Sequence, residues 1–258
     1  MVAFFLSAGT SGCFEASPVT SGSGNGPWVE EDFSAYTSTQ DWRENGCLNR
    51  PHGSDLACQS PGRQFLDKSV GYGSLTQSVR FDFVDQGGNS IMVGFPIELP
   101  SPTPEIWIEA YVRFSTNFTV CNPKFPPCDY KFILAEHTDF RGDWRLKLGG
   151  SGVASDPNFH VNANSLEFDL GIKSEPYFDG EWHRFRLHFR QASSAGAADG
   201  LIETWLDDLK APSATERNDS KIFMYLDMGR NKDKGRDSGT ESVWWGRVRV
   251  WNANPGWY

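Results

Sequence analysis

The chain has 258 residues, of which 38% are hydrophobic and 22% are charged, as in an ordinary globular protein. One domain fits this length, because β-sandwiches often reach about 200 to 250 residues as a single unit. The formal net charge of −9 argues against binding to nucleic acid, since such binding needs a basic surface to neutralise phosphates. No stretch reaches the roughly 18 apolar residues of a membrane-spanning helix.

Residues 1–13 have features of an export segment. The apolar run from Val2 to Leu6 is followed by small residues and then by Cys13, which resembles the end of a bacterial lipoprotein signal. The resemblance implies a lipid on Cys13, although the run is short and no Lys or Arg precedes it. An ordinary secretory signal with an incidental cysteine is the alternative. Both predict an exported protein, either periplasmic, at the cell surface or secreted, with membrane contact only through such a lipid.

The other four cysteines form two close pairs, Cys47 with Cys58 and Cys121 with Cys128, in loop-like settings rich in Pro, Gly and Asn. We expect local disulfides, although four cysteines allow three connectivities. A zinc site is the alternative, but these spacings are not those of metal-binding knuckles. Disulfides agree with export to an oxidising compartment.

Residues 14–27 are rich in Ser, Gly and Pro and predict a flexible linker that cannot bury a core. Residues 28–258 form the predicted folded domain, in which apolar and polar residues alternate in short runs between turn residues. We expect strands at Thr76–Val84, Ser90–Phe95, Glu105–Phe114, Lys131–Glu136, Asp143–Leu148, Asn158–Asn162, Leu166–Leu170, Trp182–Arg190, Leu201–Leu206, Ile222–Met228 and Val243–Trp251.

About a dozen such strands predict an all-β, two-sheet antiparallel sandwich, because each strand must bury one face against a second sheet. The polar face of the inner sheet is then the expected working surface.

Three tracts carry a resemblance to known proteins. Gly180–Arg190 is a Trp-His strand, and it is followed by a loop ending in Asp-Gly and by Leu201–Asp208, which closes on an acidic turn. Trp107–Ser115 and Trp244–Val250 add two further strands. Together they resemble the laminin-G-like domains and jelly-roll polysaccharide lyases of the concanavalin A-like lectin/glucanase superfamily. The resemblance implies a jelly-roll sandwich with a polysaccharide or other glycan as its partner. This sequence departs from the pattern of the resembling proteins at Gly246, where many of them carry Asp.

The catalytic motifs of the resembling enzymes are incomplete. Jelly-roll glucanases carry Glu-x-Asp-x-x-Glu, of which Glu167 and Asp169 match two acids and the third is missing. The two would suit a retaining glycosidase, whose carboxyls lie about 5 Å apart, but a solvated strand face is the simpler interpretation. The strands typical of alginate-lyase-like jelly rolls are not recognisable. If the chain is an enzyme, its residues favour a polysaccharide lyase over a glycoside hydrolase.

Cleavage of a uronate chain by β-elimination needs a cation or amide at the carboxylate, a base for the adjacent proton and an acid for the leaving oxygen. We expect the catalytic candidates Tyr111, Arg145 and His160 on one sheet face. The substrate-binding candidates on that face are Trp107, Glu109, Arg113, Lys147 and Asn162. In a lectin-like module the same residues would line a groove, with Trp107 and Tyr111 stacked on sugar rings.

The leading hypothesis is an exported carbohydrate-binding sandwich that recognises a polysaccharide on its inner sheet. The alternatives are a lyase for an acidic polysaccharide and a non-catalytic subunit of a cell-envelope assembly that docks through Trp244, Trp245 and Trp251.

No cofactor is predicted, but the loop from Asp227 to Glu241 offers oxygen ligands that suit a structural calcium ion. These ligands are Asp227, Asn231, Asp233, Asp237 and Glu241. Four cations interrupt them, which favours a self-neutralising, solvated hairpin over a metal site. The cations are Arg230, Lys232, Lys234 and Arg236.

Overall fold

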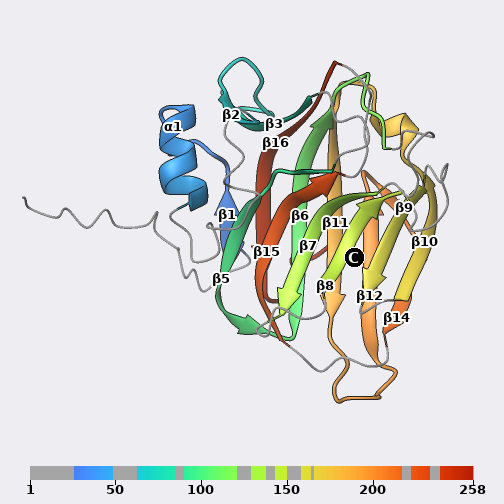
Figure 1. Ribbon diagram of the computed structural model, residues 1–258. Helices are drawn as coiled ribbons and strands as arrows, with labels where there is room; N and C mark the ends of the chain where they lie inside the picture. The colour runs from blue at the N-terminus through green and yellow to red at the C-terminus, as the bar shows by residue number, and fades with distance from the viewer. Residues whose placement is uncertain are drawn as a thin grey trace, which may run out of the picture.

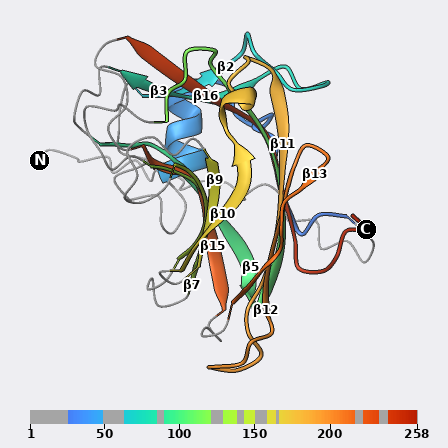
Figure 2. The same ribbon diagram turned by 90° about the vertical axis from the view of Figure 1, so that its right-hand side faces the viewer.

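A computed structural model shows two antiparallel sheets stacked face to face (Figure 1), and the view in Figure 2 shows the two layers from the side. The predicted β-sandwich is confirmed. The structure describes residues 26–48, 63–84, 90–120, 129–137, 143–149, 158–163, 166–216, 222–232 and 239–257.

Sheet A has nine strands, in the order β13-β12-β11-β6-β16-β3-β2, with β1 paired to β16 and β14 paired to β12. Their bounds are β1 Val29–Glu31, β2 Gln64–Asp67, β3 Ser78–Val84, β6 Glu105–Phe114, β11 Trp182–Arg190, β12 Gly200–Leu206, β13 Leu209–Lys210, β14 Ala214–Glu216 and β16 Thr240–Trp251.

Sheet B has seven strands, in the order β10-β9-β8-β7-β15-β4, with β5 also paired to β15. Their bounds are β4 Ile91–Met92, β5 Phe95–Thr103, β7 Tyr130–His137, β8 Asp143–Leu148, β9 Asn158–Ala163, β10 Leu166–Lys173 and β15 Phe223–Lys232.

Aromatic side chains from both sheets meet between the layers. Phe132 of β7 contacts Phe185 of β11 and Trp245 of β16, with ring centroids 4.9 and 5.0 Å apart. Trp144 of β8 meets Phe189 of β11 at 5.6 Å. Full burial of each such ring contributes about 1.5–3 kcal/mol to folding. Because alternate residues of a strand point to opposite faces, the remaining side chains form two outer faces, one on each sheet.

Each predicted strand coincides with an observed strand, but Ser90–Phe95 is divided. Regular pairing is interrupted at Val93 and Gly94 between β4 and β5, although the Val93 amide still donates to the Arg230 carbonyl oxygen at 3.0 Å. A Cβ atom at Gly94 would lie 2.7 Å from the carbonyl oxygens of Met228 and Gly229, so the neighbouring strand approaches too closely for any other residue. The short strands β1, β2, β13 and β14 carry too few residues for a visible alternation, and they were not expected. The nine-residue strand β5 was expected only at its first residue, Phe95, because Pro96, Pro100 and Pro102 interrupt the pattern.

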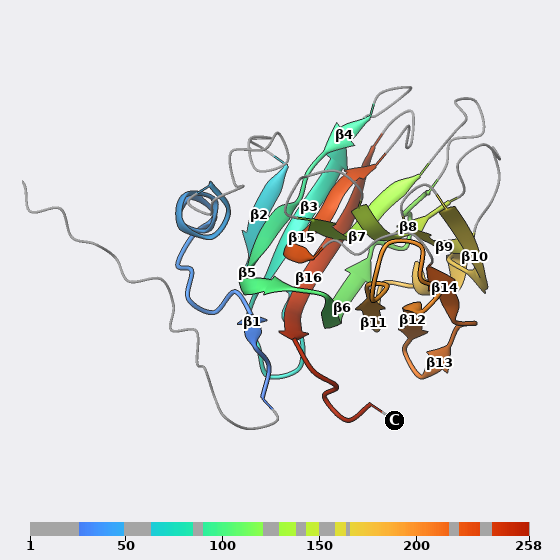
Figure 3. The same cartoon turned by 90° about the horizontal axis from the view of Figure 1, so that it is seen from below.

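A short helical segment lies beside β2 and β5 (Figure 3), formed by α1 (Thr39–Asp41) and the π-helical η1 (Trp42–Leu48). The Ser38 hydroxyl caps it by accepting a hydrogen bond from the Asp41 amide. Trp42 anchors it, with its ring centroid 5.4 Å from that of Phe95. A 3-10 turn, η2 (Glu175–Tyr177), precedes β11. None of the helices that the structure describes is long and apolar enough to cross a bilayer.

Candidate functional site

The structure divides the eight predicted site residues between two outer faces that point away from each other. Four of them, Trp107, Glu109, Tyr111 and Arg113, lie on β6 of sheet A. The other four, Arg145, Lys147, His160 and Asn162, lie on β8 and β9 of sheet B. The expectation that one face carries all eight is therefore wrong, because alternation assigns a residue to a face of its strand but does not assign the strand to a sheet. The roles of the individual residues stay predictions.

The four sheet B residues form a compact array, which we call the β8–β9 array. Arg145 lies directly opposite Asn162, and Lys147 lies directly opposite His160. Opposed residues have Cβ atoms about 5 Å apart, and the next pair on the same face is about 7 Å along the strands. Lys147 and His160 are only 1% and 4% exposed, although their side chains do not belong to the hydrophobic core. Asn162 is 8% exposed, and Arg145 is more exposed than the other three. The array therefore groups four polar side chains in a poorly hydrated setting, on the scale of one sugar residue, with Arg145 at its most accessible point.

Glu167 of β10 orders the array. One of its carboxylate oxygens accepts a hydrogen bond from the Lys147 ammonium at 2.8 Å, and the other lies 3.3 Å from Nδ1 of His160. A carboxylate at Nδ1 favours the tautomer that carries its proton there, which leaves Nε2 able to accept a proton. Asp129 lies 3.9 Å from the Lys147 ammonium on another side.

The same geometry weakens the glycosidase alternative. Asp169 accepts hydrogen bonds from the Asn158 side chain at 2.9 Å and from the Gly171 amide at 2.7 Å. With Glu167 held by Lys147, both acids of the suggested pair have structural partners.

A second polar group on this face was missed from the sequence. The Tyr225 hydroxyl donates a 2.6 Å hydrogen bond to Glu136, and Arg230 forms ion pairs with Glu136 and, at 3.3 Å, with Asp227. In sequence, Tyr225 lies two residues after the core residue Phe223, so a strict period of two assigns it to the core. A register shift between these two residues turns Tyr225 to the outer face.

On the outer face of sheet A, the predicted stacking residues are covered by the chain's own aromatic side chains. Trp107 is only 2% exposed and stacks on His188 with ring centroids 3.6 Å apart. His188 is held between Glu203 at 2.9 Å and Glu105 at 2.7 Å. From the C-terminal segment on the outer side of this sheet (Figure 2), Trp257 packs edge-on against Trp107 at 5.3 Å. Trp107 therefore offers no open ring face for stacking on a sugar.

Tyr111 is covered in a similar way. Tyr72 stacks on it with ring centroids 4.0 Å apart, and burial raises the pKa of Tyr72 to about 12. Space for this contact exists at Gly246, where a Cβ atom would lie 2.5 Å from the Tyr72 Cβ and 3.0 Å from Trp182. The Gly246 position, at which the sequence departs from the proteins it resembles, thus has a packing reason.

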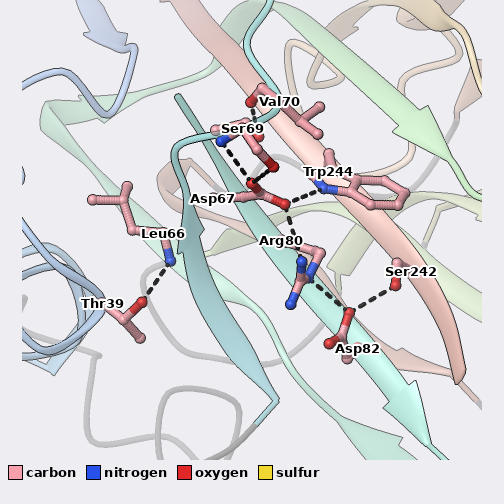
Figure 4. A network of polar contacts seen from close by, with 10 residues as sticks. Thr39, Leu66, Asp67, Ser69, Val70, Arg80, Asp82, Ser242 and Trp244 are labelled. Carbon is pink, nitrogen blue, oxygen red and sulfur yellow. Dashed lines mark hydrogen bonds and ion pairs between the residues drawn. The ribbon is translucent and has the colours of Figure 1, made fainter. Parts of the chain in front are cut away.

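Arg113 lies over the ring of Trp244 at 5.4 Å, and Trp244 in turn belongs to a polar network across β2, β3 and β16 (Figure 4). Its indole nitrogen donates to Asp67 at 3.0 Å, and Ser69 and Arg80 donate to the same carboxylate. Burial raises the pKa of Asp67, but these hydrogen bonds and the Arg80 charge outweigh it, so the pKa lies below its usual value.

The suggested docking face of three tryptophans does not exist as one surface. Trp245 is fully buried in the core, on the opposite side of the strand from Trp244. Trp251 packs with Trp107, Trp205 and Trp257. A bulge between Trp245 and Arg247 shifts the alternation within this strand.

The predicted hairpin neutralises its own charges where the structure describes it, but the prediction that it is solvated is wrong. Lys232 donates a 2.7 Å hydrogen bond to Glu241, and the two side chains are 0% and 1% exposed. Glu241 is thus engaged by a cation, and Asp227 pairs with Arg230. Asp233, Lys234, Arg236 and Asp237 lie outside the described residues. Within the described ranges, no three His, Cys, Asp or Glu residues group as metal ligands would.

The predicted disulfides and lipid anchor stay predictions. Cys47 is buried at the end of the helical segment, and Cys13, Cys58, Cys121 and Cys128 lie outside the described residues.

No protein-family model and no curated protein matches the sequence. Solved structures do resemble the fold. The endo-β-1,4-glucuronan lyase of the fungus Trichoderma reesei gives a TM-score of 0.55 at 12% identity, over 75% of this chain and 90% of that chain. Alginate lyase Aly36B gives 0.56 at 8% identity, over 86% and 96%. An Aly36B mutant in complex with alginate trisaccharide gives 0.53 at 8% identity, over 74% and 85%.

At these identities the likeness concerns the fold alone. The paired sheets, their antiparallel order and these neighbours agree with the predicted architecture. The chain has the concanavalin A-like jelly-roll fold.

Proposed function

We propose that the chain is a polysaccharide lyase that cleaves a uronate-containing polysaccharide at the β8–β9 array. The observation that carries this proposal is the pairing of Arg145 with Asn162 and of Lys147 with His160 on adjacent strands. These four residue types supply every role that β-elimination requires. The glucuronan and alginate lyases of similar fold support a uronate as the substrate class.

The reaction assigns one task to each pair. Arg145 and Asn162 bind the substrate carboxylate and stabilise the negative charge that develops when the proton on the adjacent C5 carbon is removed. His160 takes that proton at Nε2, and the Lys147 ammonium donates a proton to the glycosidic oxygen on C4. The C4–O bond breaks and a C4=C5 double bond forms, so the products are a shortened chain and an unsaturated uronate. Glu167 positions Lys147 and His160.

A low exposure of the array strengthens this chemistry, because charges in a poorly hydrated site interact more strongly than in water. Arg145 and Glu167 are more exposed than Lys147 and His160. The substrate carboxylate would therefore meet Arg145 at the more accessible side.

The test is incubation of the full chain with alginate, glucuronan and glycosaminoglycans, followed by ultraviolet absorbance of the unsaturated product. Product is expected from at least one of them, and its rate of formation is expected to fall by at least about 10²-fold in Arg145→Ala and His160→Ala. Arg190→Ala is the matched control, because Arg190 is exposed on the other sheet. Binding of a polysaccharide without any product would favour the carbohydrate-binding alternative. Absence of both would contradict the proposal.

A further inference from the structure

The outer face of sheet A carries five arginines from three adjacent strands, which we call the arginine patch. They are Arg113 on β6, Arg184 and Arg186 on β11, and Arg247 and Arg249 on β16. Their register forms rows across the sheet. One row is Arg184–Tyr111–Arg247, and the next is Arg186–Glu109–Arg249. Arg113 lies in a third row, between Trp182 and Trp244.

Positive charge exceeds negative charge in this patch. Glu109 lies 3.4 Å from Arg249, and Glu30 lies 3.3 Å from Arg247 and 3.2 Å from Arg249. The third carboxylate, Asp208, contacts Arg184 at 2.5 Å and Arg186 at 3.8 Å.

Arg113 forms no ion pair within the described part of the chain and lies over Trp244 instead. Five guanidinium groups thus face three paired carboxylates, in a chain whose net charge is −9. Burial and the positive charge of Arg184 lower the pKa of Arg186.

Aromatic side chains border the patch. Tyr72 lies over the row that contains Tyr111, and Trp257 lies near Arg186, whose guanidinium carbon is 5.5 Å from the Trp257 ring centroid. The row Arg186–Glu109–Arg249 therefore lies between two aromatic side chains, Tyr72 and Trp257. Guanidinium groups bind carboxylates or sulfates through paired hydrogen bonds, and aromatic rings offer flat apolar faces for sugar rings.

We propose that the arginine patch is a second binding surface for an acidic polysaccharide, on the side of the sandwich opposite the β8–β9 array. It goes beyond the proposed cleavage, because binding here uses none of the residues of the array. A chain held on this face would stay close to the protein between rounds of cleavage on the other face.

Binding is measured by calorimetry with alginate as the probe and neutral dextran as the control ligand. The background variant is Arg145→Ala with His160→Ala, so that alginate is not cleaved. This background is expected to retain salt-sensitive binding to alginate and none to dextran. Adding Arg113→Gln and Arg184→Gln should weaken the binding about tenfold, as expected for two partly exposed charge contacts.

Two controls separate the patch from general charge. Lys173→Gln with Arg190→Gln removes the same charge and should leave the affinity unchanged, because Lys173 is exposed on β10 of the other sheet and Arg190 lies about 13 Å along the strand from Arg186, the nearest patch residue on β11. Asp208→Asn should tighten binding, and its side chain is 91% exposed, so the fold is not at risk.

The proposal is overturned if alginate does not bind the background variant, or if the patch substitutions and Asp208→Asn both leave the affinity unchanged. Failure of the proposed lyase function would give a different result. The unmodified chain would then bind alginate but form no unsaturated product.

Discussion

The buried ion pair between Lys232 and Glu241 links the two sheets inside the sandwich, and its removal has a calculable cost. Lys232 comes from β15 of sheet B and Glu241 from β16 of sheet A. The ammonium also lies 5.6 and 5.1 Å from the ring centroids of Phe83 and Phe118. Replacing Glu241 with Gln keeps the volume but removes the charge that compensates Lys232. Loss of one partner of a buried pair costs about 3–5 kcal/mol, because the other charge stays desolvated.

Gln can still accept a hydrogen bond, so we expect the lower end of that range, about 3 kcal/mol. For a domain of this size, such a loss lowers Tm by about 6–12 °C. Urea unfolding followed by tryptophan fluorescence measures the free energy. The matched control, Glu98→Gln, makes the same chemical change at an exposed strand position and should cost less than about 0.5 kcal/mol.

The double variant Lys232→Met with Glu241→Gln should recover most of the loss, because no buried charge remains. The reasoning would be refuted if Glu241→Gln cost less than about 1 kcal/mol, or if the double variant were less stable than Glu241→Gln alone.

Three further predictions concern the site and the two faces. His160→Ala should lower the rate of unsaturated-product formation by about 10²- to 10⁴-fold, the usual contribution of a positioned base. Its side chain is only 4% exposed, so Tm should also fall, and the rate is measured well below the Tm of the variant. The pKa of Asp67 is lower in the folded protein than in the unfolded chain, where it is about 4. The carboxylate therefore stabilises the fold fully above about pH 4, and this stabilisation is lost as the pH falls through the pKa of the folded protein. Asp67→Asn should therefore flatten the decline of unfolding free energy on the acid side in urea titrations. Gly246→Ala should displace Tyr72 and cost about 1–3 kcal/mol, with a change in near-ultraviolet circular dichroism.

Each of these three predictions is contradicted by a different result. A normal rate in His160→Ala would remove it from the reaction. Parallel acid-side curves for Asp67→Asn and the unmodified chain would show that the hydrogen bonds of Asp67 do not lower its pKa. An unchanged spectrum in Gly246→Ala would mean that Tyr72 does not pack on this strand in solution.

Sequence alternation located most of the long strands because burial of one face imposes a period of two on each of them. It missed β5, whose three prolines interrupt the pattern. It also grouped Arg145 with Lys147 and His160 with Asn162 correctly, since each pair occupies alternate positions of one strand. It could not find Tyr225 on the same face, because a register shift after Phe223 reverses the alternation there. No local residue pattern marks that shift.

The sequence by itself determined that this protein is an all-β sandwich with polar strand faces, because these properties depend on neighbours along the chain. Only the tertiary structure decided which strands share a sheet, and it separated Tyr111 from Arg145 and His160. It also covered Trp107 with Trp257 and Tyr111 with Tyr72, contacts between segments far apart in sequence. The physical reason is that hydrogen bonding between strands and packing over a sheet face are contacts between residues far apart in sequence. The alternation within a single strand does not depend on these contacts and so cannot predict them.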